Sequence, residues 1–112
     1  MDIDIDDRGG LRRLRLSGEL TIYAAAQVQS AMMAAWAGAA EFEIELAGVT
    51  EIDTAGLQLL MAAKRDANAA GVPLRLTGHS APVVELLDLF DLAGWFGDPM
   101  LLPAREERTT AC

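Results

Sequence analysis

Apolar and polar positions alternate in four short stretches of the chain, which predicts strands with one apolar and one charged face. The first two stretches, residues 1–7 and 13–16, flank a Gly9-Gly10 turn signal and predict an antiparallel hairpin. Aspartates fill the polar row of the first stretch and arginines that of the second, so the two rows are expected to pair across the strands. The remaining stretches are residues 41–46, with a glutamate row expected to be solvated, and residues 72–77.

Helical spacing follows the hairpin. Apolar side chains recur in residues 28–36 at i, i+3, i+4, i+7 and i+8, which predicts one stripe of an amphipathic helix. Residues 17–19 are expected to break the preceding strand. Thr21 is the expected N-cap of the helix, and Gly38 is placed to close it.

Two further helices are predicted. After a loop over residues 48–54, residues 55–70 have an inward apolar stripe, and Gly71 ends the segment. Ser80 as N-cap and Pro82 in the first turn mark the start of the third helix.

The order of elements predicts the architecture. Strands separated by helices are expected to be parallel through right-handed crossovers, so the hairpin makes the sheet mixed. Each strand has one charged row, so helices should cover one face only, giving a two-layer α/β fold of four to five strands. Residues 100–102 are the candidate fifth strand, within a single domain over residues 1–103. Residues 104–112 are a polar C-terminal tail.

Composition narrows the classes of function. The 112 residues carry 9 basic and 17 acidic side chains, a net charge of −8, which disfavours binding to nucleic acid or to anionic lipid. One histidine and one cysteine, Cys112, leave little for a metal centre or an internal disulfide. No secretory signal and no membrane-length apolar run is visible, so a cytoplasmic protein without direct membrane insertion is expected.

Enzyme motifs do not match. No phosphate-binding loop, dinucleotide fingerprint or nucleophile elbow is present, and no cofactor or metal is expected. His79 precedes Ser80, but a nucleophile and its base must meet in space, and Ser80 is better explained as a helix cap. The sequence therefore favours a non-enzymatic protein.

Residues 49–60 form the most informative segment, because they join a strand end to a helix start. Asp53 or Thr54 is expected to accept from the first helical amides. A hydroxyl at that place is also where a phosphate is electrostatically favoured, because helix amides and the helix dipole stabilise negative charge. Phosphorylation of Thr54 would add about −1.5 to −2 charges and disturb a docked partner without unfolding the domain.

The chain resembles the STAS family, the sulfate-transporter and anti-sigma-factor-antagonist domains, over about residues 10–103. The most specific part of the resemblance is Asp53-Thr54-Ala55-Gly56-Leu57. Residues 16–21 are similar to the early strand and loop of the family, and residues 74–90 to its later strand and helix. The resemblance implies a small sheet with helices on one side.

In anti-sigma-factor antagonists, the serine after the motif aspartate is phosphorylated by the partner kinase. The resemblance thus implies Thr54 as the acceptor, although Thr and Ala55 stand where the antagonists have Ser-Ser. An anti-sigma factor, or a serine/threonine or histidine-kinase-type ATPase, is the implied partner of a monomer or weak dimer. The residues assigned to partner binding are Gly18, Glu19, Thr21, Tyr23, Asp53, Ala55, Gly56, Leu57, His79 and Ser80.

The Asp-Thr-Ala-Gly form of the motif leaves two alternatives open. It also resembles stand-alone STAS proteins that accompany chemotaxis signalling clusters. It resembles, in addition, non-enzymatic subunits that support the ATPase of a bacterial lipid-transport complex.

Overall fold

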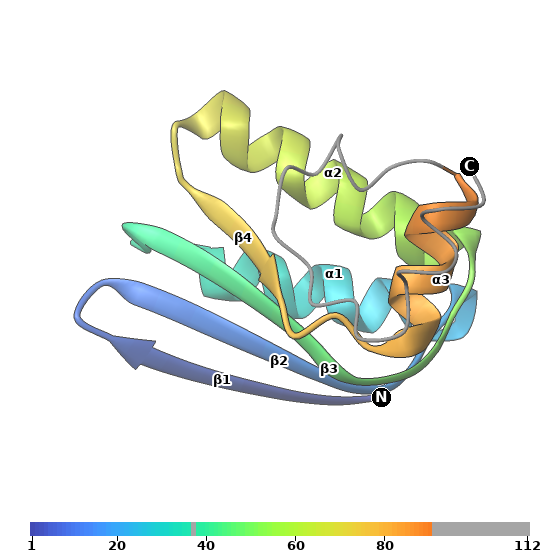
Figure 1. Cartoon of the computed structure of the whole chain (residues 1–112). Coiled ribbons are helices and arrows are strands. Elements are labelled where there is room, and N and C mark those ends of the chain that lie inside the picture. Colours follow the sequence, from blue (N-terminus) through green and yellow to red (C-terminus); the bar gives the residue numbers. More distant parts are fainter. Residues whose placement is uncertain (37, 91–112) are drawn as a thin grey trace.

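The computed structural model describes residues 1–36 and 38–90, and these form four strands and three helices (Figure 1). In chain order they are β1 (Asp2–Arg8), β2 (Leu11–Leu20), α1 (Ile22–Trp36), β3 (Glu41–Ile52), α2 (Thr54–Ala70), β4 (Leu74–Thr77) and α3 (Ala81–Leu89). The predicted strand at residues 100–102 and the predicted tail lie outside the described residues, so a domain end at residue 103 stays a prediction.

The sheet is mixed, as predicted, with the strand order β1-β2-β3-β4. β1 pairs antiparallel with β2, and the other two pairings are parallel. The hairpin register places Asp4 opposite Arg15 and Asp6 opposite Arg13, which confirms the predicted pairing of the two charged rows. Gly9 and Gly10 make the turn with positive φ angles of 57° and 95°.

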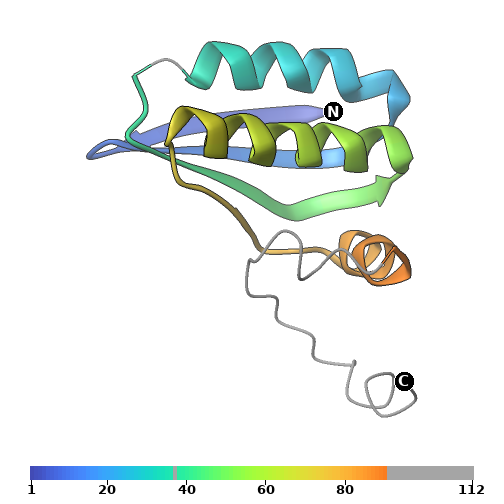
Figure 2. The ribbon, with the colours of Figure 1, turned by 90° about the horizontal axis from the view of Figure 1, so that it is seen from above.

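Helices α1 and α2 lie side by side over one face of the sheet and begin at the same end of it (Figure 2). Each presents a buried stripe, for example Val28 and Met32 of α1 and Leu60 of α2, to apolar side chains of the central strands. No described element covers the opposite face (Figure 1). The predicted two-layer α/β fold is therefore confirmed.

Two predicted interruptions are wrong, because β2 continues through residues 17–19 and β3 through residues 48–52. The two strands pair to their ends, with register shifts after Arg15 and after Gly18. Gly48 permits this irregular pairing, because a Cβ there would lie 2.4 Å from the Ser17 Oγ. Backbone pairing with a neighbouring strand thus overrides the local turn preference of these residues. β4, by contrast, begins at Leu74, two residues later than predicted.

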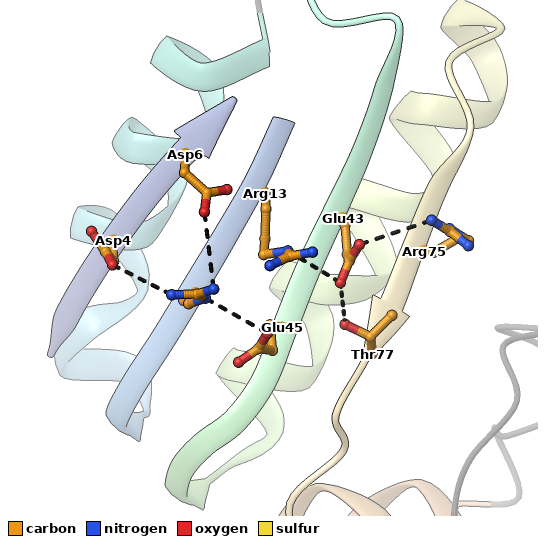
Figure 3. Close-up of polar contacts among 8 residues, drawn as sticks. Asp4, Asp6, Arg13, Glu43, Glu45, Arg75 and Thr77 are labelled. Carbon is orange, nitrogen blue, oxygen red and sulfur yellow. Dashed lines mark hydrogen bonds and ion pairs between the residues drawn. The ribbon is translucent and has the colours of Figure 1, made fainter. Parts of the chain in front are cut away.

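The open face of the sheet is a network of ion pairs (Figure 3). Its centre is Glu43, which is not solvated as predicted but only 8% exposed. Thr77 Oγ1 donates to a Glu43 carboxylate oxygen at 2.8 Å, and Arg13 Nε lies 3.5 Å from the same oxygen. Arg75 Nη2 is 3.8 Å from the other oxygen. Three residues on strands β2 and β4 therefore compensate the buried charge of β3.

Arg15 links the remaining carboxylates of this face. Its guanidinium lies 3.9 Å from Asp4, 3.9 Å from Asp6 and 3.7 Å from Glu45. These contacts join three strands, so ion pairs between strands cover the face that carries no helical layer.

Arg12 points to the other face and anchors the end of α1. It donates to the Ala35 carbonyl oxygen at 2.7 Å and to Asp7 at 3.0 Å. α1 has no basic residue in its last turn, so a β2 side chain supplies the positive charge that a helix C-terminus favours.

We expect Glu43→Ala to lower the free energy of unfolding by about 2 kcal/mol, because it leaves Arg13 without its ion-pair partner and Thr77 without its hydrogen-bond acceptor. Glu45→Ala is the matched control, since Glu45 is more exposed and should cost at most about 1 kcal/mol. Urea denaturation of both variants measures the difference. Equal losses would contradict a central role for Glu43.

Candidate functional site

The Asp53 carboxylate joins the starts of two helices. Oδ1 accepts from the Gly56 N–H at 3.0 Å, which caps α2 as predicted. Oδ2 accepts from the N–H of Ile22, the first residue of α1, also at 3.0 Å. Asp53 N–H in turn donates to the Leu20 carbonyl oxygen at 3.3 Å. One residue therefore fixes α1, α2 and the end of β2 relative to one another.

Thr21 stands directly before α1, where the N-cap was predicted, but the side-chain acceptor for the first amide of that helix comes from Asp53. The backbone oxygen of Thr21 accepts from Ala24 N–H at 2.9 Å. The residue is only 8% exposed, and its assigned contact with a partner stays a prediction.

The same hydrogen bonds shift the acidity of Asp53. The N–H of Gly56 is the main cause of a pKa below the ordinary value; partial burial opposes this shift, and the N–H of Ile22 adds to it. Asp53 is therefore ionised at neutral pH, and its charge lies at the positive ends of two helix dipoles.

Gly56 and Leu57 also have structural roles. A Cβ at Gly56 would lie 2.2 Å from the Leu20 carbonyl oxygen and 2.9 Å from its Cγ, so only glycine lets α2 approach the end of β2 this closely. Leu57 is 5% exposed and belongs to the core. Both residues are buried in the fold, and their assigned partner contacts stay predictions.

Thr54 is the motif residue that the fold leaves exposed. It is the first residue of α2, directly after the capping carboxylate, and Ala55 beside it is half-buried. The hydroxyl of Thr54 is thus presented at a helix N-terminus, as the sequence predicted.

Exposed apolar side chains accompany Thr54. Because Asp53 binds the first amide of α1, Ile22 and Tyr23 lie at the same end of the molecule, and they are 65% and 95% exposed. Glu19, paired with Glu51 of β3, is exposed nearby at the end of β2. Sequence reasoning missed Ile22; its position outside the buried stripe of α1 was the available signal.

The other two assigned residues precede a different helix, α3. Ser80 is at the N-cap position, as predicted, but its side chain makes no cap hydrogen bond. His79 and Ser80 are both half-buried. Gly18, near the end of β2, has a φ of 109° and is half-buried. Partner contacts of all these residues stay predictions.

This geometry defines a small two-layer domain with an exposed threonine at a helix start. A protein-family model described as the Mlab type of STAS domain matches residues 3–103. The chain therefore belongs to the STAS family. No curated protein matches the sequence at a significant level.

Solved structures of anti-sigma factor antagonists share the fold. A candidate antagonist from Thermotoga maritima has a TM-score of 0.79 at 15% identity, over 98% of this chain and 95% of that one. An antagonist from Mycobacterium paratuberculosis has a TM-score of 0.75 at 19% identity, over 98% of this chain and 92% of that one. Unphosphorylated SpoIIAA has a TM-score of 0.71 at 20% identity, over 97% of this chain and 93% of that one. The structure of Bacillus SpoIIAA in its phosphorylated form has a TM-score of 0.67 at 18% identity, over 98% of this chain and 97% of that one.

Within residues 1–36 and 38–90, no helix combines the length and apolarity needed to cross a membrane. In the same part of the chain, no three His, Cys, Asp or Glu side chains gather as metal ligands would.

We expect Asp53→Asn to lower stability at pH 7, because it keeps one acceptor oxygen but removes the charge from two helix starts. The pKa of Asp53 is lower in the folded than in the unfolded chain. Its contribution is therefore fully present above about pH 4 and is lost as the pH falls through the folded value. Urea midpoints from pH 7 to pH 2 should converge for the two proteins. A constant difference down to pH 2 would contradict this, and Asp2→Asn, on exposed β1, controls for the loss of one charge.

Gly56→Ala should destabilise the protein by about 2 kcal/mol, although alanine favours helices, because the methyl group meets the Leu20 carbonyl. Thermal unfolding followed by circular dichroism measures the loss. Gln58→Ala, at an exposed position of the same helix, should stay within about 0.5 kcal/mol of the wild type. A neutral Gly56→Ala would show that the approach of α2 to β2 tolerates a side chain.

Proposed function

We propose that the protein is a non-enzymatic, cytoplasmic regulator that binds an anti-sigma factor or a kinase-type ATPase and is switched by phosphorylation of Thr54. The observation that carries this proposal is the division of roles in the motif. Asp53, Gly56 and Leu57 are used by the fold, whereas Thr54 is exposed at the start of α2. The likeness in fold to anti-sigma factor antagonists supports it.

The proposed switch is electrostatic. The Thr54 hydroxyl oxygen attacks the γ-phosphorus of ATP held by the partner kinase, ADP leaves, and the hydroxyl proton passes to a base of that kinase. The product carries about −1.5 to −2 charges next to the ionised Asp53. The helix start tolerates the added charge, whereas a partner that placed its own carboxylates or apolar side chains there would be released.

Tyr23 and Ile22 are the proposed anchors of the unphosphorylated complex. A large aromatic side chain that is 95% exposed gains most by burial in a partner pocket, and aromatic residues dominate the energetics of interfaces. Both residues lie beside the start of α2, so one docked partner would cover them together with Thr54.

A second candidate function is a constitutive subunit that supports the ATPase of a transport complex. The Mlab description of the matching family model favours it. So does Ala55, which stands where the antagonists have a second serine. In that case Thr54 is a contact residue at the start of α2, and assembly does not depend on phosphate. A companion of a chemotaxis signalling cluster would act in the same way as the first candidate, through a histidine-kinase-type ATPase.

Incubation with the partner kinase and ATP should add one phosphoryl group to the protein, and mass spectrometry should locate it at Thr54. Thr54→Val removes the acceptor and should abolish labelling. Thr50→Val, at another exposed threonine, should leave it unchanged. Labelling that survives in Thr54→Val would disprove Thr54 as the acceptor.

Affinity capture from the native lysate distinguishes the two candidate functions. A kinase-like or anti-sigma protein should bind the wild type and be lost with Thr54→Glu. Gln58→Glu, which adds the same charge one turn further along α2, should retain it. Recovery of a transporter ATPase by an unphosphorylatable Thr54→Val bait would instead establish the supporting subunit.

A further inference from the structure

A second surface lies in the groove between α1 and α2, which has a volume of about 420 Å³. From α1 the groove is lined by Gln29, Met32, Met33 and Trp36. From α2 it is lined by Leu59, Ala62, Ala63 and Asp66. The two helices run side by side in the same direction along this groove (Figure 2).

The spacing of the lining residues is the same on both helices. Each set stands at i, i+3, i+4 and i+7, the four positions that share one face over two helical turns. Two parallel stripes of this kind form a seam that accepts the side chains of a third helix. The small Ala62 on one side leaves room for large side chains, and the exposed Met33 on the other adapts to their shape. Met32 and Ala63 are almost fully buried in the core at the bottom of the groove.

The composition of α1 is typical of a protein-binding surface. None of its 15 residues is charged, in a chain in which 23% of residues are. Met33 is 70% exposed, and Trp36 is half-buried. Depletion of charge and enrichment in methionine and aromatic residues distinguish the centre of an interface from ordinary surface.

We propose that this groove binds the apolar face of a basic amphipathic helix of another protein. Asp66 is the charged side chain among the described residues that line it, and it is exposed at the border of the groove. A lysine or arginine on the incoming helix complements this carboxylate, and the net charge of −8 attracts a basic partner. The same net charge opposes a second copy of this chain.

This site is separate from the Thr54 surface and does not rest on the proposed function. Asp66 follows Thr54 by twelve residues of α2, which places it roughly 18 Å further along the helix axis. Substitutions at one site should therefore leave binding at the other unchanged.

The test uses the full chain and two peptides of about 18 residues, long enough to form a helix. Both carry leucines at i, i+3, i+4 and i+7, and one has lysines and the other glutamates at its remaining positions. The lysine peptide should bind saturably. In a labelled sample it should shift the amide resonances of Met33, Ala62 and Asp66 while leaving those of Thr54 and Tyr23 in place.

Matched substitutions separate the groove from general attraction by charge. Ala62→Phe should weaken the lysine peptide by at least about tenfold, because the ring fills the groove. Ala26→Phe, at an exposed position of α1 outside the lining, should not weaken it. Asp66→Lys should weaken binding of the lysine peptide by placing a like charge at the border of the groove. Glu51→Lys, which changes the net charge equally at a distant site, should weaken it less.

Three outcomes would overturn the proposal: no saturable binding of the lysine peptide, equal effects of Asp66→Lys and Glu51→Lys, or unchanged binding to Ala62→Phe while its circular dichroism is native. A fourth is a wild-type dimer in sedimentation velocity that Ala62→Phe converts to a monomer. That result would make a second copy the occupant of the groove.

Discussion

The arrangement of the helical layer depends on one carboxylate. Asp53 accepts from the first amide of α1 and from an amide in the first turn of α2, so both helices start at one point of the sheet. Its own N–H is bound to Leu20, at the end of the strand that leads into α1. Gly56 makes this meeting sterically possible. A charge change beside Asp53 would therefore act at the point where three elements of the fold converge.

Much of the fold is predictable from local pattern. The alternation of charged and apolar residues predicted the hairpin, its Asp–Arg pairing and a sheet with helices on one face. The ends of β2 and β3 were not predictable. Ser17, Gly18 and Gly48 favour turns locally, but the pairing of β2 with β3 holds them in strands. The burial of Glu43 was also hidden from local pattern, since its three partners lie on the two neighbouring strands, β2 and β4.

The site shows the same limit. The cap of α2 and the exposed Thr54 follow from the order of residues in one short segment. The bond from Asp53 to Ile22 joins residues 31 positions apart, and no local spacing indicates it. The apolar surface beside Thr54 and the two matched stripes of the helix groove likewise arise only when α1 and α2 are brought together. The sequence pattern thus predicted an exposed threonine at the start of α2, whereas its surroundings follow only from the tertiary fold.

The position of β1 has a consequence for how the molecule meets others. In the described sheet β1 is the outermost strand, with backbone groups directed away from β2. Such a strand can recruit a foreign strand and start aggregation. Its aspartates at positions 2, 4, 6 and 7 make strand addition by another copy repulsive. The acidic row thus protects a concentrated solution of the protein against strand addition at this edge.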